Sequence, residues 1–416
     1  MFTPSFSPTN RSSAYAVVDM FSSRIQSRAK ANQLAQVRAD LEARGIPVID
    51  LMESNPTRVG FEYPTQFVDA FADDVWLNYR PTPRGLAPAR SAVAQHLGTE
   101  QHPVNPERIV LTASTSEAYT MLFKLLCDPG DQILVPQPSY PLLEHLTRLE
   151  GVESVGYPLV YHGRWEVDTE ALYARVTART RAVVVVSPNN PTGSVLLPHE
   201  LESIQTICRK VGCALISDEV FGDYIFNQSE LPRSVLHSQT DVLTFCLGGL
   251  SKAVGLPQVK LSWIVTSGVE SEVHSALDAL DFVLDTYLSV STPIQVAAPL
   301  LMEQGKQVST WIRERVAANC EALKNVMVHY PSATLLPLEG GWYGVVQVPA
   351  VLSEEQLVLE LLEHDHIYVH PGYFYDFPRE AFLVMSLLLD PGCFESAVVR
   401  MLDRAAGPRG VAIETN

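Results

Sequence analysis

Short β-branched runs alternate with longer amphipathic stretches through the middle of the chain, and this alternation constrains the fold more than any other feature. The first run, "RIVLT" at 108–112, precedes a helical pattern that stops at "DPGD", before "QILVP" at 132–136. Four more apolar runs follow in the same way, at 182–187, 213–218, 242–248 and 260–266. Strands that alternate with helices pack as a mostly parallel sheet with helices on its faces. We therefore predict an α/β fold built on a large, doubly wound sheet.

The length of the chain indicates more than one folding unit. At 416 residues it is too long for a single small core. Both flanks of the alternating region mix helical and strand patterns, so we expect them to fold together. The prediction is a large domain over residues 71–300 and a smaller α/β domain formed by residues 1–70 and 301–416.

Composition and charge exclude several classes of partner. Apolar residues make up 46% and charged residues 19% of the chain, which is an ordinary globular balance. The formal net charge of −17 disfavours nucleic acid and anionic membrane surfaces as partners. No apolar run approaches the roughly 20 residues that a bilayer requires, and the N-terminus carries no signal-peptide pattern. The six scattered cysteines form no disulfide framework or metal motif, so we expect a cytoplasmic protein without a metal site.

Polar residues follow the strand at 108–112. Ser114 and Glu117 fit the S-x-x-E capping box that begins many helices. A helix start presents free N–H groups and the positive end of the helix dipole, which suits a phosphate group. The hydroxyls of Thr115 and Ser116 would add to such a site, although a plain helix cap explains the same residues.

Three further strand ends also carry polar groups. Asn190 lies in the turn "PNNPTG", Asp218 ends the run "CALISD", and Lys252 follows "VLTFCLGG". Each has an ordinary explanation, as a turn residue, a helix cap or a solvated lysine. Together they supply an amide, a carboxylate and an amine, which a phosphorylated pyridine aldehyde needs. Because open α/β sheets bind ligands at the carboxyl ends of their strands, we expect these groups to share one site.

The motifs "SPNNPTG", "SDE" and "LSK", at these spacings, resemble the class I/II aminotransferases, which are fold-type I enzymes that use pyridoxal 5′-phosphate (PLP). The resemblance extends from about residue 50 to about residue 400. Upstream, "YRPTPRGLAPARSAVAQHL" and "DPGDQILVPQPSYP" are similar to family motifs. Downstream, "LEGGWYGVVQVP" and "VHPGYFY" are similar to two more. The resemblance implies a large PLP-binding domain beside a smaller α/β domain.

The resemblance also implies a role for each residue. Lys252 would form the Schiff base with the cofactor and carry the proton between the substrate Cα and the cofactor C4′. Asp218 would pair with the pyridinium nitrogen and keep the ring an electron sink. Asn190 would donate to the phenolic oxygen of the ring, and Tyr140 would stack on its face.

The phosphate would be held by several groups. Ser114, Thr115 and Ser116 would cradle it, and Tyr79 would reach the phosphate of the neighbouring subunit, which implies a homodimer with shared active sites. Lys260 stands where the family usually has an arginine. A lysine supplies charge there but not the bidentate fork of a guanidinium group.

The chain departs from the family pattern at three further positions. Phe221 replaces a tyrosine that donates to the ring oxygen, and Gly249 replaces a serine that gives the phosphate a hydroxyl. Val384 takes the place of the arginine that binds the substrate α-carboxylate, a strong charge-assisted contact. Either a shifted arginine, with Arg379 the nearest candidate, replaces it, or the substrate lacks this carboxylate, or the protein binds PLP without turning over amino acids.

Other candidates for the substrate side are neutral. Asn55, Trp342 and Tyr287 fall in motifs near the substrate, and Tyr287 stands where members with acidic substrates carry an arginine. Each is also explained by ordinary packing. Their character indicates a substrate side chain that is not acidic.

Three functions are consistent with these residues. The first is a transaminase that moves an amino group from a non-acidic α-amino acid to a keto acceptor. The second is a PLP-dependent lyase, decarboxylase or synthase on the same fold. The third is a non-catalytic PLP-binding module, which the acidic composition and the absence of a helix-turn-helix pattern disfavour. A dinucleotide enzyme is disfavoured because no G-x-G-x-x-G motif follows a strand.

Overall fold

The computed structural model describes residues 22–25, 33–72, 74–227 and 231–407 of the chain. By its internal contacts the chain divides into residues 1–30 and residues 31–416. Of the first part, the structure describes one short 3-10 turn, Ser23–Ile25. The second part contains the sheets and all the helices named below.

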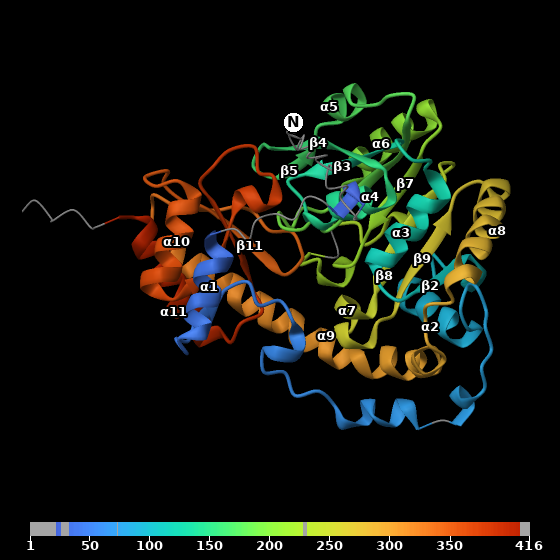
Figure 1. The fold of residues 1–416 in the computed structure, drawn as a ribbon, viewed down its shortest axis with the longest axis horizontal. Coiled ribbons are helices and arrows are strands. Elements are labelled where there is room, and N and C mark those ends of the chain that lie inside the picture. The colour runs from blue at the N-terminus through green and yellow to red at the C-terminus, as the bar shows by residue number, and fades with distance from the viewer. Residues whose placement is uncertain (1–21, 26–32, 73, 228–230, 408–416) are drawn as a thin grey trace, which may run out of the picture. The chain divides into compact units, whose positions relative to one another are not determined.

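Within the described residues, a large sheet of eight strands forms the centre of this second part (Figure 1). Its strands are β2 (Ile109–Thr112), β3 (Gln132–Gln137), β4 (Glu153–Tyr161), β5 (Trp165–Val167), β6 (Thr180–Val186), β7 (Ala214–Asp218), β8 (Thr244–Gly249) and β9 (Ser262–Ser267). They lie in the order β2-β9-β8-β7-β6-β3-β4-β5. The five strands from β8 to β4 run parallel, whereas β9 is antiparallel to both of its neighbours and β5 is antiparallel to β4.

Helices cover both faces of the large sheet because its strands are apolar on both faces. On one face, Leu122, Leu146 and Leu280 pack against Val184 and Ile216 in one core. They come from α3 (Thr115–Leu126), α4 (Leu142–Glu150) and α8 (Glu270–Tyr287). The other face packs against α2 (Ala87–Leu97), α5 (Thr169–Ala174) and α6 (Pro198–Val211). The predicted doubly wound, mostly parallel sheet is therefore confirmed.

A second, smaller sheet contains four strands in the described part of the chain. These are β10 (Thr334–Leu335), β11 (Tyr343–Gln347), β14 (Phe382–Ser386) and β13 (His370–Pro371), in that order and antiparallel. The helices α10 (Glu354–Asp365) and α11 (Pro391–Ala405) pack beside it. The short strand β1 (Ile49–Asp50) pairs in parallel with β12 (Ile367–Tyr368), so residues near the two ends of the chain fold together.

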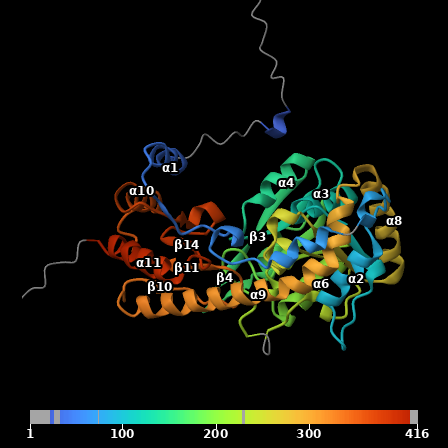
Figure 2. The same ribbon diagram turned by 90° about the horizontal axis from the view of Figure 1, so that it is seen from below.

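The long helix α9 (Thr292–Met327) links the two sheets (Figure 2). It contacts α2 beside the large sheet, and α11 and β10 beside the small one. Because α9 runs without a break through position 300, the predicted boundary at 300/301 falls inside a helix, and the two-domain division stays a prediction. The helix α1 (Gln33–Ala43), which precedes β1, packs on α10. In the described part of the chain, no helix has the combined length and apolarity that a membrane span needs.

Candidate active site

The strands that precede the predicted residues are neighbours, so their carboxyl ends lie at one edge of the large sheet. Strands β6, β7 and β8 are adjacent and parallel, and β2 runs in the same direction because antiparallel β9 lies between it and β8. Asn190 follows β6, Asp218 ends β7, Lys252 follows β8, and Ser114 follows β2. The structure therefore brings these four residues to the edge where α/β sheets bind ligands.

The amine of Lys252 lies among aromatic side chains. Lys252 is in the short helix α7 (Leu250–Ala253), which follows β8 directly. Its Nζ lies 4.5 Å from the ring centroid of Trp342 and 5.6 Å from that of Phe221. The Tyr224 hydroxyl donates to the Lys252 carbonyl at 2.6 Å and fixes the helix locally. Burial lowers the pKa of the Lys252 amine to about 8, so this is not a solvated lysine.

A tyrosine that the sequence motifs do not indicate holds the Asp218 carboxylate. The hydroxyl of Tyr119, on α3, donates to Asp218 Oδ2 at 2.8 Å, and the Val220 N–H donates to Oδ1 at 3.2 Å. Burial raises the pKa of Asp218, and these two hydrogen bonds partly offset the rise. In the sequence, only the position of Tyr119 could have indicated this role. Tyr119 lies one helical turn after Thr115, on the face of α3 that covers the sheet.

The two asparagines after β6 have different environments. The Nδ2 group of Asn189 donates to the Pro138 carbonyl at 3.1 Å and so ties the turn to the loop that carries Tyr140. The Oδ1 atom of Asn190 is buried and has no hydrogen-bond partner among the described residues. An unpaired buried amide end costs about 1–3 kcal/mol, which a bound ligand would recover. Tyr140 itself is 48% exposed, at the edge of this loop.

The start of α3 is the helix cap that the sequence predicts. The Ser114 Oγ atom accepts from the Glu117 N–H at 3.1 Å. The Glu117 carboxylate accepts from the Ala113 N–H at 2.6 Å, one residue before the position that a standard capping box uses. It also accepts from the Ser289 hydroxyl at 2.8 Å. Thr115 and Ser116 occupy the first turn, where N–H groups are free for an anion.

Two residues that replace phosphate-binding residues of the family, Lys260 and Gly249, lie next to β9. Lys260 is exposed, two residues before β9, and adopts the left-handed conformation with φ 59°. Gly249 ends β8 and lies directly opposite Ser262, the first residue of β9. Of this opposed pair, Ser262 therefore carries the hydroxyl.

The residue in the place of the carboxylate-binding arginine, Val384, is fully buried in the small sheet. It lies opposite Val345 on one side and His370 on the other. Directly opposite residues share a face of a sheet, and Tyr343, two residues before Val345, lies on that face too. The Tyr343 ring contacts the Phe221 ring at 6.2 Å, so this face looks towards Lys252.

His370 joins two tyrosines on this face. Its Nε2 atom lies 3.0 Å from the Tyr368 hydroxyl, and its Nδ1 atom lies 3.1 Å from the Tyr375 hydroxyl. Burial lowers the pKa of His370 to about 4, so the imidazole is neutral. Burial also raises the pKa of Tyr375, and the phenols of Tyr343 and Tyr140 nearby add to that rise. The wall beside Val384 therefore offers neutral hydrogen-bonding groups.

Four predicted residues lie apart from these groups or serve local structure. Tyr79 is 75% exposed, and Tyr287 is 50% exposed at the end of α8. Arg379 is exposed and donates to Gln347, which lies at the opposite end of β11 from Tyr343. Asn55 caps a short turn by accepting from the Thr57 N–H at 3.0 Å. Its neighbour Ser54 hydrogen-bonds to the Tyr343 side chain, so of these four residues Asn55 adjoins the small-sheet side of the site.

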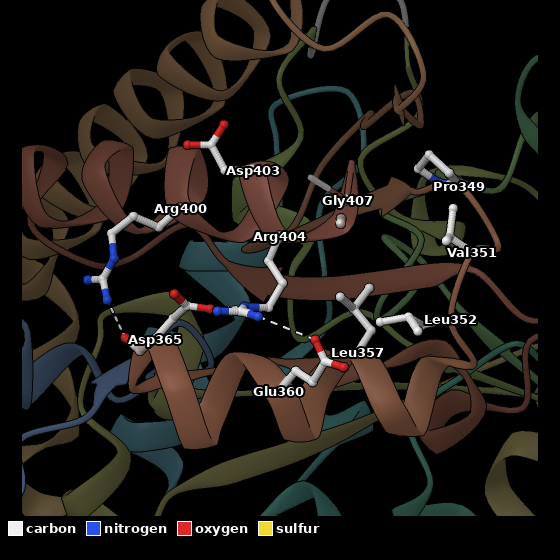
Figure 3. A pocket seen from close by; sticks show the side chains of 11 residues that line it. Pro349, Val351, Leu352, Leu357, Glu360, Asp365, Arg400, Asp403, Arg404 and Gly407 are labelled. Atoms are coloured by element: carbon white, nitrogen blue, oxygen red, sulfur yellow. Dashed lines mark hydrogen bonds and ion pairs between the residues drawn. The ribbon is translucent and has the colours of Figure 1, made fainter. Parts of the chain in front are cut away.

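A surface pocket of about 630 Å³ lies between α10 and α11, away from the strand ends (Figure 3). In Figure 3, Arg404 reaches between Glu360 and Asp365, and Arg400 points at the Asp365 carbonyl. These charges neutralise one another, and none of the residues predicted from the sequence lines the pocket. We assign no part of the site to it.

Comparison with known proteins agrees with this geometry. The sequence profile described as "Aminotransferase class I and II" matches residues 40–390. The chain is 27% identical to the glutamate-pyruvate aminotransferase AlaA of Haemophilus influenzae, over 80% of this chain and 84% of that protein. It is also 27% identical to an alanine aminotransferase of Mycobacterium tuberculosis, over 82% of each chain.

The fold matches solved structures as well. An alanine aminotransferase from Pyrococcus furiosus superposes with a TM-score of 0.82 at 25% identity, over 93% of this chain and all of that chain. An aspartate aminotransferase from Thermus thermophilus matches with a TM-score of 0.79 at 21% identity, over 92% of this chain and all of the other. The profile, the relatives and the fold agree, and the chain belongs to the class I and II aminotransferases, a family of PLP-dependent enzymes.

Proposed function

We propose that this PLP-dependent aminotransferase moves the amino group of a non-acidic α-amino acid to a keto acceptor, with Lys252 as the residue that links to the cofactor. The observation that carries the proposal is the half-buried Lys252 amine, which lies against the Trp342 and Phe221 rings at the carboxyl edge of the sheet. A homodimer in the cytoplasm, with Tyr79 reaching the partner's site, completes the proposal.

The residues at the strand ends fit the cofactor. The buried Asn190 amide has an end without a partner, which suits an oxygen of the ring, since the O and N ends of an amide exchange by a flip. The buried Asp218 carboxylate suits the ring nitrogen, and the free N–H groups at the start of α3 suit a phosphate. When bound, PLP supplies an aldehyde that links to amines and a pyridine ring that accepts the electron pair released at the substrate Cα.

Lys252 carries the proton in this proposal. An amine with a pKa of about 8 is partly neutral at neutral pH, so it would be able to link to an aldehyde and to accept a proton. With PLP bound, the Lys252 amine would hold on its Nζ the proton released from the substrate Cα. The surrounding Trp342 and Phe221 rings keep water away from the amine during the transfer.

Asp218 would keep the ring nitrogen of bound PLP protonated. Its carboxylate would stabilise the cationic nitrogen by charge, and Tyr119 holds Oδ2 so that the carboxylate keeps one orientation. The phosphate would lie against Ser114, Thr115 and Ser116, with Lys260 adding charge. Tyr140, at the edge of the same opening, would cover the ring face.

The substrate side of the site is neutral in this proposal. Val384, Tyr343 and the His370–Tyr375 pair share the face that looks towards Lys252, and they offer hydroxyl groups in place of a guanidinium group. Trp342 also belongs here, because it contacts the Lys252 amine. Tyr287 and Arg379 stay candidates that a second subunit or a closing movement would have to bring in, whereas Asn55 follows Ser54, which hydrogen-bonds to Tyr343. Two relatives are named for alanine, a small, non-acidic substrate, and the glutamate-pyruvate aminotransferase is named for an acidic one as well.

The wall around Val384 also favours a second candidate, a reaction on amines without an α-carboxylate. Burying a carboxylate without a cation is costly. Three described arginines of this region bond to other groups: Arg379 to Gln347, Arg38 to Asp50 and Arg315 to the Leu388 carbonyl. Both candidates use the same cofactor and the same lysine. They differ only in the substrate that the neutral wall accepts.

One experiment separates the two candidates. The purified protein, loaded with PLP, is mixed with amino acids and with the matching primary amines, and the absorbance of the bound cofactor is followed without an acceptor. Conversion by an α-amino acid, reversed by a keto acid, supports transamination of amino acids. Conversion by amines alone supports the second candidate, and release of ammonia or a thiol without an acceptor would contradict both.

A further inference from the structure

Ser262 stands between the two strands that lead to the proposed phosphate site and to Lys252. As the first residue of β9, it lies opposite Thr112 of β2 and opposite Gly249 of β8. Thr112 is followed by the cap and first turn of α3, and Gly249 precedes α7. The three residues form one row across neighbouring strand ends, with Ser262 in the middle.

The Ser262 side chain lies on the face of the sheet that α3 covers. Alternate residues of a strand share a face, and Ile264, two residues along β9, packs in the core with Leu122 of α3. The directly opposite Gly249 belongs to the same face, as does Leu247 in that core. The Ser262 hydroxyl is therefore on the α3 side, at the end of the sheet where α3 begins.

Gly249 leaves the space that Ser262 occupies. A Cβ atom at Gly249 would lie 2.3 Å from the Ser262 Oγ and 3.1 Å from its Cβ, so a side chain at Gly249 would require Ser262 to move. The φ angle of Gly249 is −176°, an extended conformation that any residue adopts. Space, and not backbone conformation, is thus the reason for glycine at this position.

The Ser262 hydroxyl has no hydrogen-bond partner among the described residues. The residue is 2% exposed, and its Oγ is not among the fully enclosed unpaired atoms, so the hydroxyl borders open space at the end of the strand. A buried hydroxyl without a partner costs free energy unless a ligand or water satisfies it. It lies on the same face as the free N–H groups of the first turn of α3, which attract an anion.

We infer that the Ser262 hydroxyl donates a hydrogen bond to the phosphate group of PLP, from the strand next to the one where the family places its serine. In this chain the side chain stands at Ser262 and the gap at Gly249, so the hydroxyl comes from the strand opposite the position of the family's serine. This inference rests on the cofactor position given under the proposed function. It adds a binding residue that the motifs do not contain.

The test measures cofactor binding and needs no amino substrate. The cofactor-free protein and its Ser262→Ala variant are titrated with PLP and, separately, with pyridoxal, which lacks the phosphate group. Because a hydrogen bond to a charged group contributes more than a neutral one, we expect Ser262→Ala to raise the Kd for PLP by roughly 10- to 100-fold. The Kd for pyridoxal should stay within about threefold of wild type, because only the phosphate contact is lost.

Two further variants complete the design. The double exchange Gly249→Ser with Ser262→Gly returns the hydroxyl to the other strand, and we expect it to bind PLP within about fivefold of wild type. Ser267→Ala, at the far end of the same strand, is the matched control and should bind both ligands as wild type does. Melting temperatures of the cofactor-free variants show that each one folds.

The outcomes are distinct. A Ser262→Ala protein that folds and binds PLP like wild type would overturn the inference. An equal rise in the Kd for PLP and in the Kd for pyridoxal would overturn it too, because it would mean that Ser262 serves packing. A folded double exchange that binds PLP as weakly as Ser262→Ala would contradict the equivalence of the two positions. If PLP binds as expected but no donor converts it, the proposed function fails while the role of Ser262 stands.

Discussion

At the scale of single residues, the reactivity of Lys252 follows from its surroundings. Burial beside Trp342 lowers the pKa of its amine to about 8, from the ordinary value of 10.5. Above that pH the amine is neutral and attacks an aldehyde. The rate constant for capture of PLP by the cofactor-free protein should therefore rise with pH, reach half its maximum near pH 8 and level off. Stopped-flow absorbance measures this profile, and a midpoint near 10 would mean that the amine is solvated.

Tyr119 affects the charge of Asp218. Removing its hydroxyl takes away a bond that lowers the pKa of a carboxyl already raised by burial, so the pKa of Asp218 rises further in Tyr119→Phe. Asp218 is charged above its pKa, and protonation therefore removes the partner of the ring nitrogen at a higher pH than in wild type. We expect the acid limb of the transamination profile to shift upwards and PLP affinity to fall by about tenfold.

A matched variant controls for the loss of a buried hydroxyl. Tyr157→Phe removes a hydroxyl that donates to the Val184 carbonyl, with no contact to Asp218. It should lower stability but leave the acid limb unchanged. Equal pH profiles for the two variants would show that Tyr119 serves packing alone.

Removing the Tyr375 hydroxyl tests whether the neutral wall beside Val384 binds the substrate. Tyr375→Phe removes a hydrogen-bonding group fixed by His370, so the KM for the amino donor should rise by about 5- to 20-fold while PLP affinity is retained. Tyr330→Phe, whose hydroxyl bonds to Asp403 at 2.9 Å beside α11, serves as the control. An unchanged KM in Tyr375→Phe would place the substrate elsewhere.

At the scale of elements, the cap of α3 has both a structural and a binding role. Ser114→Ala should lower the free energy of unfolding by about 1 kcal/mol, as losses of N-caps do, and should also weaken PLP binding. Ser353 caps α10 in the same way, by accepting from the Gln356 N–H at 3.3 Å. Urea unfolding should show a similar loss for Ser353→Ala, whereas a titration with PLP should show no effect of that variant.

The elements show how far the sequence could predict the site. The strand runs and the polar groups after them were predicted because periodicity and turn chemistry are local. The antiparallel direction of β9 was not predicted, because the direction of a strand depends on the segment that connects it to the strand before. A parallel return normally needs a helical crossover, and the segment from Leu250 to Leu261 instead turns back along the same edge. Only that pairing places Ser262 opposite Gly249, so no local pattern could indicate it.

On the substrate side too, strand pairing places residues together that the sequence does not show as neighbours. The sequence showed that Val384 replaces an arginine, but its neighbours come from pairing between β13 and β14. His370 and Tyr375 lie in the motif "VHPGYFY", where their aromatic character looks like packing. Their role near Val384 becomes visible only when the two strands are paired.

At the scale of the whole molecule, the proposed site belongs to two subunits. A Lys252→Ala protein and a Tyr79→Ala protein each lack one group of every site in their homodimers. In a mixed dimer, one site contains both defects and the other contains an intact Lys252 and an intact Tyr79. Refolding an equal mixture should therefore restore roughly a quarter of the wild-type sites, measured by PLP binding. No recovery above the average of the two parents would mean that each subunit holds its cofactor alone.

The parallel pair of β1 and β12 has a consequence for how the protein is made. Ile49 meets Ile367 in this pair, so the early strand has no partner until most of the chain has been translated. At about 5–20 residues per second, this wait lasts roughly 15 to 60 seconds on the ribosome. During that time the large sheet can assemble from segments already released, while the N-terminal segment stays open to chaperones. Newly made chains should therefore acquire a protected large sheet before the small sheet is complete.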